Sequence, residues 1–238
     1  MTNTLFGFFR AYTFIALFAA AGHSLGGFDL KDTLTYSFLT QSMIMTIQLW
    51  GWWDIATSIR TGDIVTDLFR PYDYQMWWLA QDLGRALFHL LSRGIFPFVI
   101  GAIAFNLRLP ERPETWIFVL LSLILAVFVS FGIRFIINLW SFWLLDHRGA
   151  AALLVITWSF LSGFIVPIAL FPESLRGPVL ALPFAATLQT PINIFLEKYF
   201  GTELVGALAL QAMWALALLL AGRWLLSIAT RRLVTQGG

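Results

Sequence analysis

Residues 55–93 read IATSIRTGDIVTDLFRPYDYQMWWLAQDLGRALFHLLSR, and long apolar segments lie on both sides of this stretch. The stretch is polar for a chain in which 59% of the residues are hydrophobic and only 12% are charged. Its charged residues include Arg60, Asp63, Asp67, Arg70, Asp73, Asp82 and Arg85. A polar, helix-compatible segment between two membrane spans faces water, so this one is predicted to be a docking surface for a partner.

The composition is that of a membrane protein. The mean hydropathy is +0.79, and the charged fraction is far below the value of about 25% that is typical of soluble domains. Several apolar runs reach the length of about 20 residues that a helix needs to cross a bilayer. These runs are too long and too uniform for barrel strands, so the spans are helices. The predicted fold class is an all-α, polytopic membrane protein.

Six membrane-spanning helices are predicted within one domain that covers residues 1–238. They lie at about residues 5–21, 33–53, 86–105, 115–145, 150–171 and 204–228. Between the last two, residues 172–202 contain four prolines and several charges, which no single crossing helix accommodates. Short interfacial or re-entrant helices are predicted there instead.

The distribution of basic residues near the helix ends predicts the orientation. Both termini and residues 55–85 are predicted to be cytoplasmic, and residues 172–202 to lie outside. Residues 10–21 leave an alternative open, because a basic residue before a short apolar core and small residues is typical of a cleaved leader. The later topology is the same in both interpretations.

The sequence offers no catalytic or metal site. It has no nucleotide-binding loop, no G-x-S-x-G elbow and no H-E-x-x-H pair. There is no cysteine, and His23, His89 and His147 share no spacing. The net charge of +2 is too small to indicate nucleic-acid binding. The chain is therefore predicted not to be an enzyme, and to hold no cofactor of its own.

Two predicted spans carry polar stripes at helical spacing. Such a stripe turns away from lipid, either toward a neighbouring helix or toward a wet path. Both interpretations stay open, and an arginine within a span also needs a counter-ion or access to water. The candidate path-lining residues are Ser37, Gln41, Gln48, Arg134 and Asn138.

Within the polar stretch, Ile55, Ile59, Leu68 and Phe69 alternate with charged residues. This pattern predicts short amphipathic helices that are bent around Gly62 and Pro71. Such helices lie on lipid headgroups or insert into the groove of a partner. The acidic residues favour a protein partner over an anionic membrane surface.

A family resemblance supports the docking interpretation. Residues 60–75 read RTGDIVTDLFRPYDYQ and continue at residues 77–85 as WWLAQDLGR. This run resembles bacterial ABC transporter permeases of the type-2 (exporter) class. SFWLLD at residues 141–146 and VTQGG at residues 234–238 are also similar to that class. The likeness spans nearly the whole chain.

The resemblance implies a membrane permease subunit of an ATP-driven exporter in the bacterial cytoplasmic membrane. It implies six spans, a second permease subunit that is the same or a different chain, and separate ATPase subunits that carry ATP and Mg²⁺. It also implies a cytoplasmic coupling helix between the second and third spans, and short extracellular helices before the sixth. The residues expected to couple to the ATPase are Arg60, Gly62, Asp63, Asp67, Leu68, Phe69, Arg70 and Pro71.

One departure from the family concerns the start of the chain. Relatives begin with a basic amphipathic helix on the inner membrane face, and the resemblance implies that this helix is missing here. The alternative function is a stand-alone secondary carrier. Such carriers usually show an internal repeat and acidic residues in mid-membrane, and the sequence shows neither. The substrate is not readable from the sequence.

Overall fold

The computed structural model describes residues 2–21, 26–47, 52–144 and 148–232. These residues form helices joined by turns and short irregular segments, with no β-strand among them. The prediction of an all-α fold is therefore confirmed. The prediction of six spans is met only in part, because four helices of the described chain are long and apolar enough to cross a membrane. These four are Thr2–Ala20, Tyr74–Phe105, Pro113–Phe142 and Thr202–Ala229.

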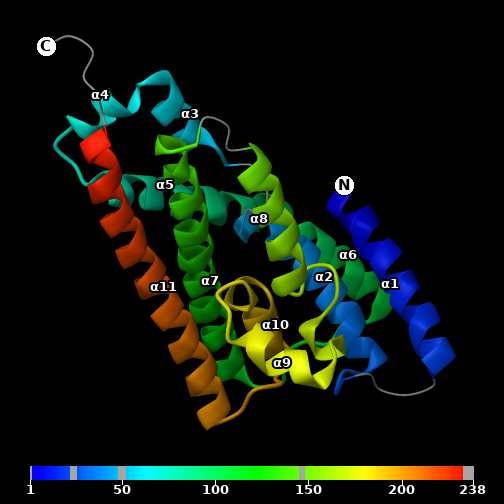
Figure 1. Cartoon of the computed structure of the whole chain (residues 1–238). Helices are drawn as coiled ribbons and strands as arrows, with labels where there is room; N and C mark the ends of the chain where they lie inside the picture. The colour runs from blue at the N-terminus through cyan, green and yellow to red at the C-terminus, as the bar shows by residue number, and fades with distance from the viewer. Residues whose placement is uncertain (1, 22–25, 48–51, 145–147, 233–238) are drawn as a thin grey trace, which may run out of the picture.

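The first half of the chain contains two long helices, the short polar helices and a long rod. Its elements are α1 (Thr2–Ala21), α2 (Leu30–Ile47), α3 (Asp54–Thr61), α4 (Ile64–Leu68), α5 (Tyr74–His89), the π-helix η1 (Leu90–Gly94) and α6 (Ile95–Phe105). The second half follows as α7 (Pro113–Leu139), η2 (Trp140–Phe142), α8 (Arg148–Leu161), η3 (Ile168–Leu170), α9 (Glu173–Leu180), η4 (Ala185–Thr187), α10 (Gln189–Phe195), α11 (Thr202–Ala229) and η5 (Thr230–Arg232). Figure 1 shows α7 in the middle of the bundle, beside α11.

The helix α2 is central and polar. Nearly all of its side chains are buried against other parts of the chain. Few of them would face lipid, so the helix can be polar. This explains why α2 does not qualify as a membrane span by hydropathy alone. The prediction of a second span at residues 33–53 corresponds to this helix up to Ile47, and residues 48–51 lie outside the described part.

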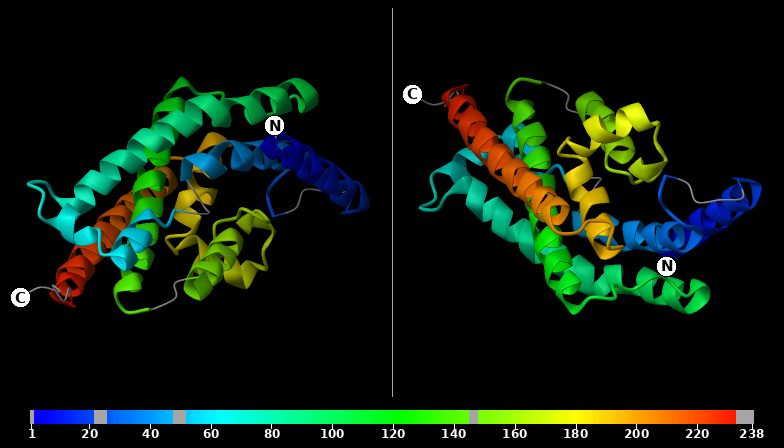
Figure 2. Two further views of the ribbon diagram at one scale, coloured as in Figure 1. Left: turned by 90° about the horizontal axis from the view of Figure 1, so that it is seen from above. Right: turned by 90° about the horizontal axis from the view of Figure 1, so that it is seen from below.

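The third predicted span, residues 86–105, is the second half of a longer rod. The elements α5, η1 and α6 follow one another without a break and run along one edge of the molecule, opposite α8 (Figure 2). The π-helical turn brings Gly94 against α2, where an added Cβ would lie 2.9 Å from the carbonyl oxygen of Ser42. A π-helical turn admits an extra residue into the helix at such a contact.

The fifth helix differs from its prediction of residues 150–171. α8 ends at Leu161, because Gly163 takes a left-handed conformation with φ of +83°. The hydroxyl of Tyr36 donates a hydrogen bond to the carbonyl oxygen of Gly163 at 2.8 Å and holds this turn against α2. The proline-rich segment that follows forms short helices, α9, η4 and α10, where short helices were predicted.

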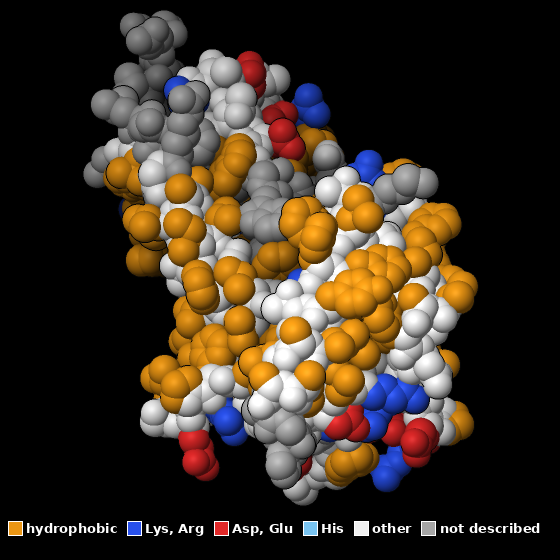
Figure 3. All heavy atoms as spheres, turned by 90° about the vertical axis from the view of Figure 1, so that its right-hand side faces the viewer, with side chains coloured by type: hydrophobic (Ala, Val, Ile, Leu, Met, Phe, Trp, Pro, Cys, Tyr) orange, Lys and Arg blue, Asp and Glu red, His pale blue; other side chains and the backbone are white. Residues whose placement is uncertain are grey.

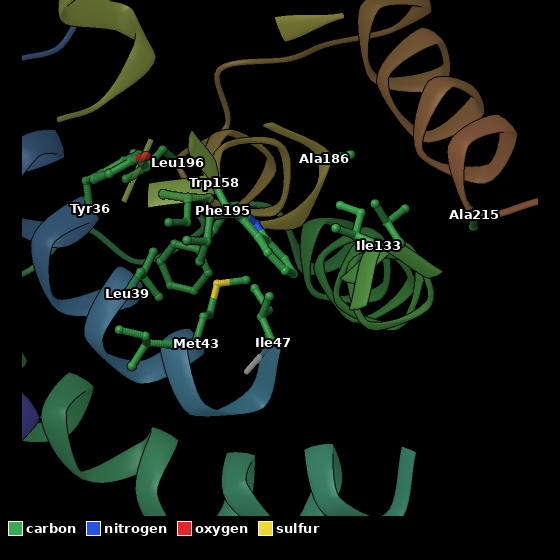
Figure 4. Packing of buried hydrophobic residues seen from close by; sticks show 14 of the residues in the cluster. Tyr36, Leu39, Met43, Ile47, Ile133, Trp158, Ala186, Phe195, Leu196 and Ala215 are labelled. Carbon is green, nitrogen blue, oxygen red and sulfur yellow. The ribbon is translucent and has the colours of Figure 1, made fainter. Parts of the chain in front are cut away.

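The main core lies between α2, α7, α8 and α10. Figure 4 shows side chains of α2, among them Met43 and Ile47, close to Trp158 of α8 and Phe195 near the end of α10. Trp158 is fully buried, and its indole nitrogen donates to the hydroxyl of Thr187 at 2.9 Å. The core fixes α7 relative to α2 and so positions the polar groups described below.

Charge gathers at the two ends of the bundle. On the face drawn in Figure 3, hydrophobic side chains cover the middle, and most charged side chains lie near the upper and lower ends. This is the distribution expected of a protein with a membrane around its middle.

Candidate functional site

The two short helices α3 and α4 lie at one end of the molecule, next to the end of α11 (Figure 1). We call residues 54–71 the α3–α4 segment. Its two helices join at Gly62, whose φ of +85° is a left-handed conformation that glycine adopts readily. Open space surrounds the position where a Cβ would lie, so the backbone conformation alone favours glycine.

One side of the α3–α4 segment is anchored to the membrane helices. Ile55 and Ile64 are 0% exposed and pack in an apolar cluster with residues of α5 and α7, including Tyr74 and Phe135. Leu68 is half-buried against the same cluster. Burial of an isoleucine side chain contributes roughly 1.5–3 kcal/mol, so these contacts hold the segment firmly.

The opposite side of the segment is exposed. Phe69 is 82% exposed, which leaves a large aromatic side chain with little packing in this chain. The carboxylate of half-buried Asp67 lies 3.7 Å from the guanidinium of exposed Arg70, and a pair so close to the surface is worth at most about 1 kcal/mol. The hydroxyl of Thr61 donates to the carboxylate of Asp63 at 2.6 Å. The other exposed members of the predicted set are Arg60, Gly62 and Pro71.

The structure therefore brings all the predicted coupling residues into one segment, with an apolar side turned inward and a charged side turned outward. Contact of this segment with another protein stays a prediction.

The polar stripe of α7 makes interhelical hydrogen bonds. Arg134 donates to the carboxylate of Asp82 on α5, from Nη1 at 3.1 Å and from Nη2 at 2.7 Å. Nη2 also donates to the hydroxyl of Ser130 at 3.1 Å. One turn further along, the side chain of Asn138 donates to the carbonyl oxygen of Trp52 at 3.0 Å and accepts from the amide of Ala56 at 3.0 Å. These bonds tie α7 to α5 and to the start of α3.

Asp82 is the counter-ion that an arginine within a span requires. The sequence assigned Asp82 to the polar stretch and gave no reason to pair it with Arg134. Arg85, three residues after Asp82, donates from Nε to the same carboxylate at 2.9 Å. Its other nitrogens donate to the carbonyl oxygens of Met45 and Thr46 at 2.7 and 3.1 Å. The sequence signals of this site were the need of Arg134 for a counter-ion and the spacing of Asp82 and Arg85 by three residues.

The polar stripe of α2 is also buried. The hydroxyl of Ser37 donates to the carbonyl oxygen of Thr33 at 2.8 Å, and Gln41 is 3% exposed. Gln48, the third predicted residue of this stripe, lies outside the described residues. In the isolated chain, Ser37, Gln41, Arg134 and Asn138 all lie between helices, and a role in lining a path stays a prediction.

A second ionic cluster lies at the other end of the bundle, and the sequence did not reveal it. Asp32 at the start of α2 is 2.6 Å from Lys198 and 3.1 Å from Arg108. Arg108 also pairs with Asp29 at 2.7 Å. These residues come from the turn before α2 and its first turn, from the segment after α6 and from the turn after α10, so the cluster ties the three regions together.

Glu197, beside Lys198, stabilises the start of α7. Its carboxylate accepts from the amide of Arg112 at 3.0 Å and from the hydroxyl of Thr115 at 2.7 Å. Partial burial acts to raise the pKa of Glu197, but these hydrogen bonds, one from the backbone of Glu111 and the charge of Arg112 outweigh it and lower the pKa. The carboxylate thus joins the residue just before α7 to the third residue of that helix.

Within the described residues, no three His, Cys, Asp or Glu side chains come close enough to hold a metal ion. His23 and His147 lie outside those residues.

Comparisons with curated proteins and with solved structures give no significant match. A family model described as ABC-2 family transporter protein matches residues 5–237, which is almost the entire chain. The long apolar helices and the polar segment between them agree with a membrane transport component of this kind. The chain belongs to the ABC-2 family of transporter proteins and is an ABC-2 type permease.

Proposed function

We propose that the chain is the membrane-spanning permease subunit of an ATP-driven exporter. Two such subunits, identical or different, form the translocation path, and separate ATPase subunits that bind ATP and Mg²⁺ supply the energy. The chain crosses the bacterial cytoplasmic membrane six times, with α2 and α8 as the two crossings that hydropathy alone does not identify. Both termini and the α3–α4 segment face the cytoplasm.

The observation that carries this proposal is the two-sided α3–α4 segment. Its buried isoleucines fasten it to α5 and α7, and its outer side presents Phe69 together with charges of both signs. An aromatic side chain in a rim of charged residues is typical of a protein interface, where the aromatic fills a pocket and the charges set the orientation. We propose that this side docks on the ATPase and moves with it.

The α3–α4 segment would act as the coupling helix. ATP binding closes the two ATPase subunits, the segment follows, and the membrane helices rearrange to open the path outward. Ser37, Gln41 and Gln48 of the second span are the proposed lining of that path, together with Arg134 and Asn138. Because the described members of this set are buried in the isolated chain, helices must separate to expose them.

A purification from membranes tests the proposal. The tagged chain is extracted in mild detergent, and vanadate-sensitive ATP hydrolysis is measured in the eluate. We expect the activity to co-purify with a separate soluble ATPase chain. A stable, folded chain that elutes without any ATPase would contradict the proposal and favour a stand-alone carrier.

A further inference from the structure

Two of the buried charges among the described residues, Asp82 and Arg134, meet where four elements come together, whereas buried Asp32 belongs to the cluster at the other end. Asp82 of α5 is 1% exposed, Arg134 of α7 is 3% exposed, and Arg85 of α5 completes the group. Charged side chains within membrane-spanning helices are costly and are usually functional. Replacement of a buried ion pair by apolar residues is often neutral or stabilising, so stability alone does not account for the group.

One set of contacts of the group leads to the entry of α3. Asn138 lies one turn beyond Arg134 and binds the backbone on both sides of that entry, at the carbonyl of Trp52 and the amide of Ala56. The guanidinium of Arg134 lies over the Trp52 ring, with its carbon 5.0 Å from the ring centre. The start of α3 is thus fastened to α7 by two hydrogen bonds between the Asn138 side chain and backbone groups, and by a cation–π contact.

The same group reaches two further helices. Arg134 grips the carboxylate of Asp82 with two nitrogens, a geometry that fixes orientation as well as distance. From α5, Arg85 binds two carbonyl oxygens at the end of α2. A displacement of α3 therefore has to move α7, or break these bonds, and α5 and the end of α2 follow α7.

We infer that Asp82, Arg85, Arg134 and Asn138 form a clamp that transmits movement of the α3–α4 segment to α7. This inference deepens the proposed function and rests on it, since the movement is supplied by the docked ATPase. Asn138 and Arg134 are positioning residues in this role. The α7 helix is about 40 Å long at 1.5 Å per residue, longer than the bilayer core, so it carries the movement to the far end.

The link itself is tested in the full chain without its partners. Asn138→Leu removes the side-chain bonds to α3 and keeps a similar volume. Gln211→Met is the matched control, because Gln211 is equally buried and makes three bonds to Ser122 and Ala186, away from α3. Amide hydrogen exchange of residues 52–61 is followed in lipid nanodiscs.

We expect exchange at Ala56 to rise at least tenfold in Asn138→Leu and to stay unchanged in Gln211→Met. Equal exchange in both variants and the parent would overturn the clamp.

Transmission is tested in the complex with its ATPase subunits. The chain has no cysteine, so spin labels on Thr57→Cys of α3 and Glu114→Cys of α7 are the only ones on this subunit. Both positions are exposed. The distance between the labels is measured before and after trapping with ATP and vanadate. We expect trapping to leave the distance unchanged in the parent and in Gln211→Met, because α3 and α7 move together, and to shift it in Asn138→Leu.

The other outcomes distinguish a failure of the clamp from a failure of ATPase docking. A shift in the parent itself means that α3 moves without α7, which overturns the clamp. If trapping leaves the distance between the labels unchanged in both the parent and Asn138→Leu, no movement reaches α3. If the exchange experiment has shown the link, that second result overturns the docking role of the α3–α4 segment rather than the link.

Discussion

Asp82 is a single buried carboxylate that is bound by two arginines. Because there are two positive charges and one negative charge, substitutions of the acid and of an arginine should differ in their effect on stability. The carboxylate accepts from Arg85 and Arg134, so its removal strands two positive charges. We expect Asp82→Leu to lower the free energy of unfolding by about 3–5 kcal/mol, the usual effect of leaving a buried charge unpaired. Arg134→Leu leaves Asp82 paired with Arg85 and should be milder. Thermal unfolding of the purified variants in detergent measures both, and a milder effect of Asp82→Leu would contradict this assignment.

Glu197 gives the far end of the bundle an acid sensitivity. Its pKa is lowered in the folded chain, so its stabilising effect is present above the pKa of the unfolded chain, near 4.5. The effect is lost as the pH falls through the lower folded pKa. We expect the start of α7 to loosen below about pH 4.5 in the parent, and Glu197→Gln to remove that dependence. Hydrogen exchange at residues 112–116 between pH 7 and pH 3.5 measures it, with amide rates corrected for pH.

At the scale of single residues, the sequence predicted an amphipathic segment, but neither the side on which Phe69 lies nor the ion pair of Arg134. It grouped Phe69 with the apolar residues Ile55 and Leu68, whereas the structure buries Ile55 and leaves Phe69 82% exposed beside the charges. It could show that Arg134 needs a counter-ion. It could not identify Asp82, since the pairing depends on how α5 and α7 cross, and that crossing is set by tertiary packing.

Among the elements, α2 and α6 approach closely because small residues face a large ring. Gly101 of α6 lies directly against the ring of Phe38, and an added Cβ would overlap that ring. Phe38 is fully buried and packs against Phe8 and Phe105, with ring centres 5.6 and 5.7 Å away. The ring therefore has no free space into which to move.

We expect Gly101→Ala to lower the free energy of unfolding by about 1–3 kcal/mol through overpacking. Gly84→Ala on α5 is the matched control, since nothing lies within 4 Å of its Cβ position. Alanine has the higher helix propensity, so that change should be neutral or stabilising by up to about 1 kcal/mol. Chemical denaturation of both variants measures these changes in the free energy of unfolding. An equal decrease in both variants would contradict the close approach of α2 and α6.

Hydropathy predicted the uniformly apolar helices well and the mixed ones poorly. The last span was predicted at residues 204–228, and a helix long and apolar enough to cross a membrane runs from Thr202 to Ala229. Most of its side chains face outward, so its composition is uniformly apolar. The α5–η1–α6 rod joins a polar half to an apolar half. Hydropathy therefore predicted a span over the apolar half alone, although the helical backbone is continuous through both halves. The end of α8 depends on a left-handed Gly163 held by Tyr36, a long-range contact that has no local signal.

At the scale of the whole molecule, the exposed charges of the α3–α4 segment should govern assembly with the ATPase. The double variant Asp67→Arg with Arg70→Asp exchanges the two charges. The two side chains still attract each other, but each position presents the opposite charge to a partner. We expect unchanged insertion and stability, because exposed pairs contribute little. Retention of the ATPase should fall at least tenfold, since misplaced charges at an interface cost several kcal/mol.

Adding Asp63→Arg should deepen that loss and uncouple ATP hydrolysis from export. The measurement is ATPase activity per purified permease. Normal assembly and activity in the triple variant would contradict a coupling role for these charges.

The most direct measurement is photo-cross-linking from Phe69 in intact membranes. A photoreactive amino acid replaces Phe69, and a second preparation carries it at Ile103 of α6, which is also 82% exposed but lies on an apolar membrane helix. We expect an adduct between the Phe69 position and a separate ATPase chain, with none from the Ile103 position. Equal labelling from both positions, or no ATPase adduct from Phe69 in membranes where the permease is folded, would show that the α3–α4 segment does not dock on the ATPase.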